Sequence, residues 1–176
     1  MEVDITKLDD VRWKPPDNGK LMINVDAATN NKNSSKGLGV MIRDSLGEFV
    51  LSKTIFWPFR ISIEATEALE IKWGFFSALE AGLSGFSIAS DCLTVVNALK
   101  SKDRALCEFG ITLDEIFYLA NCSNFEGFVF VPRYANKVAH CLARFVVLSN
   151  SSQVWKREIP SCGWSTMFAD KPFPLY

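Results

Sequence analysis

The strongest constraint on the fold is the stretch Leu21–Ala28, an apolar run that contains a single carboxylate. Every second residue from Leu21 to Val25 is apolar, and the positions between them become polar toward Asp26, which predicts a strand with one apolar face. A carboxylate at the end of a central strand is costly to desolvate, and a bound cation is one way to offset that cost. The alternative is that Asp26 starts a turn, since polar residues crowd positions 29–35.

Length and composition limit the class of protein. The 176 residues suffice for one domain with a substantial core, and 48% hydrophobic residues with 14 Phe and 5 Trp are typical of a globular protein. The formal net charge of −1 leaves no overall basic field, so nucleic-acid binding would depend on a local patch or a bridging metal ion. Five cysteines without a CxxC motif predict reduced thiols.

The chain divides into three parts. We predict an N-terminal tether over residues 1–12, a domain over 13–148 and a C-terminal extension over 149–176. The first ten residues are acidic and contain no apolar stretch, and no apolar run approaches the ~20 residues that span a bilayer. We therefore expect an intracellular protein, in the nucleus or cytoplasm, that is monomeric, not secreted and not bound to a membrane. Trp155, Trp164 and Phe168 make the extension too apolar for a free linker, so part of it should pack on the domain or bind a partner.

Hydrophobic periodicity predicts the element order β-β-β-α-β-α-α-β-α. The expected strands are 21–28, 37–43, 48–57, 86–91 and 127–131, and the expected helices are 63–82, 92–100, 108–120 and 135–148. This order predicts an α/β fold with a five-stranded mixed sheet, an antiparallel meander followed by parallel strands, and helices on both faces. The segment 127–131 is apolar throughout, which predicts burial on both faces. Gly37 and Gly39 indicate a close approach of another backbone.

Three acidic residues occupy the positions where such sheets place functional groups. Asp26 and Asp91 end predicted strands, and Glu67 lies near the start of the first predicted helix. Because sites in open α/β sheets lie beyond the carboxyl ends of strands, the two aspartates converge if their strands are parallel neighbours. Three carboxylates suit Mg²⁺ or Mn²⁺ as hard oxygen ligands. Two such ions ~4 Å apart would support attack of water on a phosphodiester.

Four segments carry a resemblance to a known family. They are Trp13–Ala28 with the motif Ile-Asn-Val-Asp-Ala-Ala, Gly37–Gly47 with Gly-Leu-Gly-Val-Met-Ile-Arg-Asp, Thr66–Leu99 with Thr-Glu-Ala-Leu and Ser-Asp-Cys-Leu, and Val131–Arg144. On these segments the chain resembles a type 1 ribonuclease H domain, in the plant form related to the ribonuclease H of non-LTR retrotransposon reverse transcriptases. The resemblance implies the RNase H-like fold and two-metal-ion hydrolysis of the RNA strand of RNA–DNA hybrids, with Mg²⁺ or Mn²⁺.

The resemblance also implies an active site of four acids. Three of them match Asp26, Glu67 and Asp91, which are thereby implied to be catalytic and metal-binding. Glu67 is preferred because the helix pattern aligns through Gly74 and Ala78. The neighbouring Glu64 and Glu70 are expected on the solvated face of the same helix.

The fourth acidic position is His140, which we count among the catalytic residues. Asn136, His140 and Arg144 recur every four residues and therefore share one helix face. A neutral imidazole can bind a metal ion, but it is a softer ligand that suits Mn²⁺ better than Mg²⁺. The alternative is a surface histidine without a ligand role.

Nucleic-acid contacts are predicted for basic and amide side chains near the last helix. They are Arg133, Asn136, Lys137 and Arg144, with Arg43 among the further basic candidates. The catalytic loop histidine and the basic protrusion of some family members have no match, so hybrid recognition should depend on shape and 2′-hydroxyls and should weaken with salt. The leading function is a hybrid-cleaving endonuclease. The alternative is a catalytically weakened or inactive retroelement-derived domain that binds nucleic acid or a partner.

Overall fold

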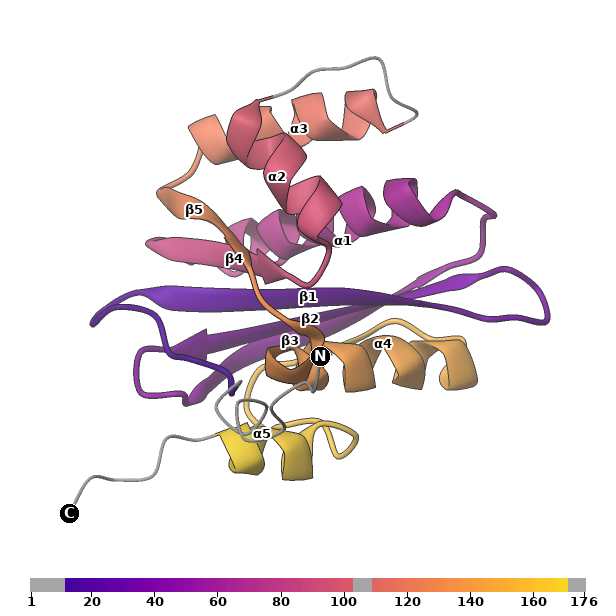
Figure 1. Cartoon of the computed structure of the whole chain (residues 1–176). Helices are drawn as coiled ribbons and strands as arrows, with labels where there is room; N and C mark the ends of the chain where they lie inside the picture. Colours follow the sequence, from indigo (N-terminus) through magenta and orange to yellow (C-terminus); the bar gives the residue numbers. More distant parts are fainter. Residues whose placement is uncertain (1–11, 103–108, 171–176) are drawn as a thin grey trace, which may run out of the picture.

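The fold is built on one mixed sheet (Figure 1). The computed structural model describes residues 12–102 and 109–170. β1 (Leu21–Thr29), β2 (Lys36–Asp44) and β3 (Phe49–Trp57) form the expected antiparallel meander. β4 (Phe86–Ser90) pairs in parallel with β1, and β5 (Phe125–Phe130) pairs in parallel with β4. The strand order is β5-β4-β1-β2-β3-β6.

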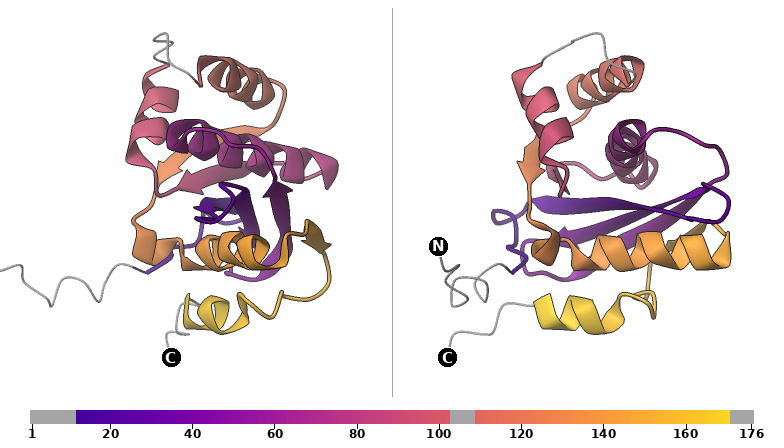
Figure 2. Two further views of the ribbon diagram at one scale, coloured as in Figure 1. Left: turned by 90° about the vertical axis from the view of Figure 1, so that its right-hand side faces the viewer. Right: turned by 45° about the vertical axis from the view of Figure 1, so that its right-hand side comes forward.

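Helices cover both faces of this sheet, as predicted (Figures 1 and 2). One face carries α1 (Ile63–Glu80), α2 (Leu93–Ser101) and α3 (Gly110–Asn121), and the other carries α4 (Lys137–Ser149) and α5 (Trp164–Asp170). The larger apolar core fills the space between the sheet and the layer of α1, α2 and α3. A smaller core of Met41, Val138, Leu142 and Met167 lies between the sheet, α4 and α5. The chain therefore has the predicted α/β architecture, with a mixed sheet and helices on both faces.

The two faces of β1 have different chemistry. Because side chains alternate along a strand, Ile23 and Val25 face α1, while Asn24 and Asp26 face α4. Glycines on β2 bring α4 close: a side-chain carbon at Gly37 or Gly39 would collide with carbonyl oxygens of α4. The close backbone approach predicted from these glycines is confirmed, and it fixes α4 directly over the polar face of β1.

Two predictions about the sheet are wrong. A sixth strand, β6 (Gln153–Trp155), pairs antiparallel with Ser52–Thr54 of β3. Without it β3 would present an open edge with unpaired backbone groups, and three residues are too few to show an alternating pattern. The last predicted strand is not buried on both faces, because β5 is the outer strand: Glu126 is exposed and Phe130 retains 38% of its accessible surface.

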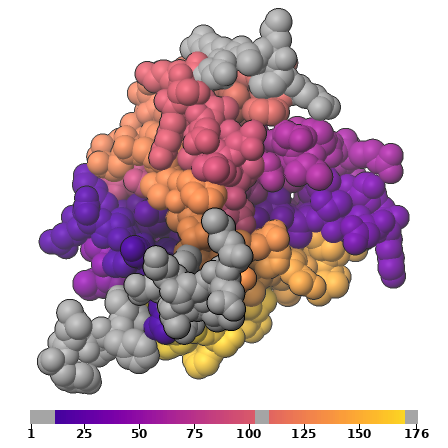
Figure 3. Space-filling model, viewed as in Figure 1, coloured from indigo at the N-terminus to yellow at the C-terminus, as the bar shows by residue number. Residues whose placement is uncertain are grey.

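The C-terminal extension packs on the domain, as expected for part of it. Its Met167 is buried, and Trp155 packs against Phe145 of α4. In Figure 3 its yellow surface adjoins the orange surface of α4 on the lower side of the molecule. The Asp170 carboxylate of α5 binds Arg43 at 3.1 Å, and the Arg43 side chain is only 1% exposed, so the prediction of a phosphate contact by Arg43 is wrong.

Other parts of the domain prediction are not tested by these contacts. The tether over residues 1–12 lies outside the described residues apart from Arg12. The boundary at residue 148, the monomeric state and the intracellular location stay predictions. Within the described residues, no helix combines the length and hydrophobicity needed to cross a membrane.

Candidate active site at the carboxyl ends of β1 and β4

Asp26 and Asp91 come from matching positions on neighbouring parallel strands. The ladder between β1 and β4 ends at the pair Asn24–Ala89, and each aspartate follows that pair by two residues. The strands are thus parallel neighbours, which was the condition for convergence. The Asp91 carboxylate is close enough to raise the pKa of Asp26. β1 continues to Thr29, so the alternative of a turn at Asp26 is wrong.

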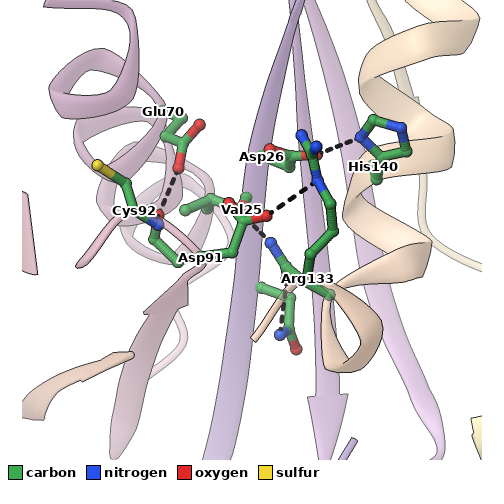
Figure 4. Close-up of polar contacts among 10 residues, drawn as sticks. Val25, Asp26, Glu70, Asp91, Cys92, Arg133 and His140 are labelled. Carbon is green, nitrogen blue, oxygen red and sulfur yellow. Dashed lines mark hydrogen bonds and ion pairs between the residues drawn. The ribbon is translucent and has the colours of Figure 1, made fainter. Parts of the chain in front are cut away.

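Asp26 is buried against α4. Its side chain is 6% exposed, and its Oδ2 atom lies 2.7 Å from Nδ1 of His140 (Figure 4). Burial, with a further contribution from Asp91, raises the pKa of Asp26 to about 6, although the contact with His140 opposes this shift. His140 therefore contacts the site through Asp26, although its side chain keeps 32% of its accessible surface, and the alternative of a histidine without a ligand role stays open. Its role as a metal ligand stays a prediction.

Asp91 lies at the rim of the same site. Its carboxylate is 3.5 Å from Nε of Arg133, which belongs to a 3₁₀ turn over Arg133–Ala135 before α4. The Arg133 side chain is 71% exposed, so solvent screens this long ion pair and the guanidinium is free to contact a ligand. A cationic side chain thus stands beside the more accessible of the two aspartates.

Helix α1 brings two glutamates to the other side of the aspartates. Its N-terminus is capped by Ser62, whose hydroxyl accepts a bond from the Ala65 amide, so Glu67 and Glu70 lie in the first turns. The half-buried Glu67 accepts a hydrogen bond from the Cys92 thiol at 2.7 Å. Burial and this contact raise the pKa of Cys92 to about 12, so the thiol keeps its proton and remains a donor.

Glu70 contradicts its prediction. It was expected on the solvated face of α1, but only 1% of the residue is exposed. Its Oε1 atom accepts a bond from the Ser90 hydroxyl at 2.7 Å, while Oε2 has no hydrogen-bond partner among the described residues. Glu70 follows Glu67 by three positions and therefore lies on the same side of the helix. That spacing was the signal in the sequence that could have identified it.

The described side chains do not gather around one point. Each acid has its own partner: Asp26 contacts His140, Asp91 contacts Arg133, Glu67 contacts Cys92 and Glu70 contacts Ser90. Among the described residues, no three His, Cys, Asp or Glu side chains lie near enough to share one metal ion. The arrangement therefore does not bring the predicted ligands Asp26, Glu67 and Asp91 within reach of a single ion, and their ligand role stays a prediction.

The chemistry of the donors nevertheless fits a hard divalent cation. All the acids offer carboxylate oxygens, which Mg²⁺ and Mn²⁺ prefer. Burial and mutual repulsion raise the pKa of Asp26 and of Glu70, and one buried oxygen of Glu70 lacks a partner among the described groups. This excess of negative charge is what a cation would balance.

One predicted nucleic-acid contact is wrong. Asn136 is 1% exposed, and its amide is used inside the protein: Nδ2 donates to the Val25 carbonyl at 2.8 Å, and Oδ1 accepts from Asn24 at 3.0 Å. Its function is to hold the start of α4 against β1, because a buried amide must bond within the protein. Lys137 and Arg144 are exposed on α4, and together with Arg133 they stay predicted contacts.

Comparisons with known proteins agree with this fold. The model of the reverse transcriptase-like family matches residues 24–146. Ribonuclease H1 from the halophilic archaeon Halobacterium salinarum superposes with a TM-score of 0.67 at 17% identity, over 76% of this chain and 100% of that one. LC11-RNase H1, a compost-derived protein solved in complex with an RNA/DNA hybrid, superposes with a TM-score of 0.66 at 15% identity, over 74% of this chain and 99% of that one.

A third solved structure extends the likeness to another organism. The N-terminal RNase H domain of a Mycobacterium tuberculosis protein gives a TM-score of 0.63 at 19% identity, over 74% of this chain and 94% of that one. No curated protein sequence matches the chain. At these identities the solved structures establish the shared fold.

Proposed function

The chain belongs to the reverse transcriptase-like family and has an RNase H-like fold, and from this we propose that it is a metal-dependent endonuclease hydrolysing the RNA strand of RNA–DNA hybrids. The observation that carries the proposal is the matching placement of Asp26 and Asp91, with His140 of α4 against Asp26. A relation to plant retrotransposon enzymes is part of the proposal. It is supported by the sequence segments that carry the resemblance.

The proposed cofactor is Mg²⁺ or Mn²⁺, held by Asp26, Glu67 and Asp91. Bound cations would activate the attacking water and stabilise the leaving oxygen. The chain's own part is to place the carboxylates at the site and free them to bind. For this Glu67 gives up its contact with the Cys92 thiol, and Asp91 gives up the 3.5 Å contact with Arg133.

Basic side chains beside the acids would hold the substrate. Arg133, released from Asp91, is placed to bind a backbone phosphate, since its guanidinium is mostly exposed at the rim. Lys137 and Arg144 continue this exposed basic surface along α4. Few phosphate contacts imply modest affinity that falls with salt, so preference for a hybrid would come from its shape and 2′-hydroxyls.

The direct test is cleavage of a hybrid labelled on either strand, with Mg²⁺ and separately with Mn²⁺. The expected result is cleavage of the RNA strand and no cleavage of duplex DNA. Asp26→Asn and Asp91→Asn should each lower the rate more than about 100-fold. Glu64→Gln, which removes a charge from the exposed side of α1, serves as the matched control and should leave the rate unchanged. Equal cutting of duplex DNA would contradict the proposal.

His140 determines which metal ion works best. A neutral group at the fourth position removes one negative charge, so a second cation should bind weakly and activity should be higher in Mn²⁺ than in Mg²⁺. His140→Asp should therefore raise the Mg²⁺-supported rate. If the parent is already fully active in Mg²⁺ and the variant gains nothing, histidine is a competent member of the site.

A second candidate is a binding domain without catalysis. Two observations favour it. Basic side chains, Arg133 and His140, already contact the two aspartates. Among the described residues, no three His, Cys, Asp or Glu side chains lie close enough to hold one metal ion. In that case neither the parent nor His140→Asp cleaves in either metal. Hybrid binding, measured by fluorescence anisotropy, should still weaken with salt and with Arg133→Ala.

A further inference from the structure

Glu70 is a buried acid that the proposed mechanism does not use. It is 1% exposed and lies on the face of α1 that meets β4. The Ser90 hydroxyl satisfies only one carboxyl oxygen, and Oε2 is unpaired among the described residues. Burying a carboxyl group with one unpaired oxygen is unfavourable, and an apolar side chain would avoid this cost. Packing alone therefore does not account for Glu70.

Three other carboxylates act on Glu70 within the described part of the chain. Burial raises its pKa, and the carboxylates of Asp26, Asp91 and Glu67 raise it further. The Ser90 hydroxyl that Glu70 accepts from comes directly before Asp91, so Glu70 lies beside the candidate site. In Figure 4, Asp26 and Asp91 lie between Glu70 on the α1 side and His140 on the α4 side.

We propose that Glu70 supplies the fourth carboxyl group of the metal site, from α1, in place of the acid that His140 replaces on α4. This inference rests on the proposed metal dependence. It assigns the unpaired Oε2 atom to a cation or to a water molecule that the cation holds. The number of acids around the site then remains four: Asp26, Glu67, Asp91 and Glu70.

The experiment measures binding of Mg²⁺ and Mn²⁺ to the full chain by calorimetry, without nucleic acid. Glu70→Gln removes the charge, keeps the shape and can still accept the Ser90 bond. Its metal affinity should be about 10- to 100-fold weaker than that of the parent. Glu64→Gln removes the same charge from the exposed side of the same helix and should change the affinity less than twofold. An affinity of Glu70→Gln within twofold of the parent would overturn the inference.

A double variant tests whether a carboxyl group at position 140 can replace the one at position 70. If Glu70 compensates for His140, then Glu70→Gln combined with His140→Asp should recover most of the lost affinity. A purely structural role of Glu70 predicts that His140→Asp raises the affinity by the same factor in the parent and in Glu70→Gln, whereas compensation predicts a larger gain in Glu70→Gln. Failure of the double variant to bind more tightly than Glu70→Gln would therefore count against the inference.

Folding is followed by thermal unfolding without metal. Glu70→Gln should be at least as stable as the parent at neutral pH, since a buried amide carries no charge. Should it not fold, Glu70→Met provides a charge-free side chain of similar length with the same expected loss of affinity. If the variants bind metal as tightly as the parent and the parent cleaves hybrid, this inference alone is overturned. If the Glu70 variants bind metal more weakly but the parent does not cleave hybrid, only the proposed function is overturned.

Discussion

Two groups of buried and half-buried polar side chains differ in the balance of their charges. The first, called here the Arg43 cluster, consists of Trp13, Asn24, Arg43, Asn136 and Asp170. The second, the carboxylate cluster, consists of Asp26, Glu67, Glu70 and Asp91. The Arg43 cluster contains one cation and one anion. The carboxylate cluster contains four acids, and among the described residues the cation-forming side chains that contact them are His140 and the exposed Arg133.

The Arg43 cluster is satisfied almost entirely by the chain itself. Arg43 pairs with Asp170, and its guanidinium lies 3.8 Å from the ring centre of Trp13. Trp13 donates to Asn24 at 2.9 Å, and Asn24 donates to Asn136. Burial lowers the pKa of Arg43 to about 10, so the side chain remains charged at neutral pH. These contacts hold the N-terminal segment, α4 and α5 on one face of the sheet.

The carboxylate cluster has no such balance. Burial and like charges raise the pKa of Asp26 and Glu70. The comparison teaches that a buried charge with a counter-charge in the chain contributes to structure. A buried excess of one sign instead indicates a site that is completed from outside.

The largest expected effect comes from breaking the charge balance of the Arg43 cluster. Arg43→Met removes the cation that pairs with Asp170 and leaves this buried carboxylate only the weaker influence of Lys137 and Arg12, which should lower the free energy of unfolding by about 3–5 kcal/mol. Combining it with Asp170→Leu should recover most of the loss, because both charges are then gone. Urea denaturation measures both effects. Lys53→Met, which breaks the more exposed pair with Glu80, should cost less than about 1 kcal/mol.

Replacing Asp26 should have an intermediate effect on stability with the opposite sign, because the replacement should stabilise the protein at neutral pH. Its pKa rises from 3.8 to about 6 on folding, so its contribution to stability is full below pH 3.8 and is lost as the pH rises through about 6. Without metal, the parent should lose about 1–3 kcal/mol between about pH 4 and pH 7 from this group. Asp26→Asn should remove that loss and be the more stable protein at neutral pH.

Chemical denaturation in the presence of a chelator, at a series of pH values, measures this difference. Asp17→Asn, which removes a carboxylate from an exposed turn, is the matched control. Saturating Mg²⁺ should abolish the advantage of Asp26→Asn, because the cation stabilises only the ionised parent. If the parent without metal is most stable at neutral pH, the carboxylate cluster does not destabilise the fold, and the proposed difference between the two clusters is wrong.

The smallest effect tests one hydrogen bond inside the balanced cluster. Trp13→Phe keeps an aromatic ring beside Arg43 and removes the donor to Asn24. The expected loss is about 1–2 kcal/mol, since Asn24 retains only a 3.5 Å contact from Arg43 to the same oxygen. Trp164→Phe, on the exposed side of α5, should change the free energy of unfolding by less than about 0.5 kcal/mol. Equal losses in both variants would show that ring size, not the bond, matters.

Local pattern was enough to predict most of the fold. Alternation in β1 placed Asp26 on a polar strand face, and the glycines of β2 predicted that another backbone comes close, which the structure shows to be that of α4. Three features were not predictable in this way. β6 is too short to show a period, α1 is apolar on several sides and so marks no solvated face for Glu70, and Arg43 meets a partner 127 positions away. Only long-range packing determines which of these polar groups becomes buried.

That separation of 127 positions also has a consequence for synthesis on the ribosome. Arg43 emerges long before Asp170, so a growing chain can pair β1, β2 and β3 while the guanidinium is still hydrated. The layer formed by α4 and α5 gains the counter-charge of Arg43 only after Asp170 has left the exit tunnel. We expect a nascent chain arrested before residue 170 to keep this face of the sheet open to solvent and to chaperones.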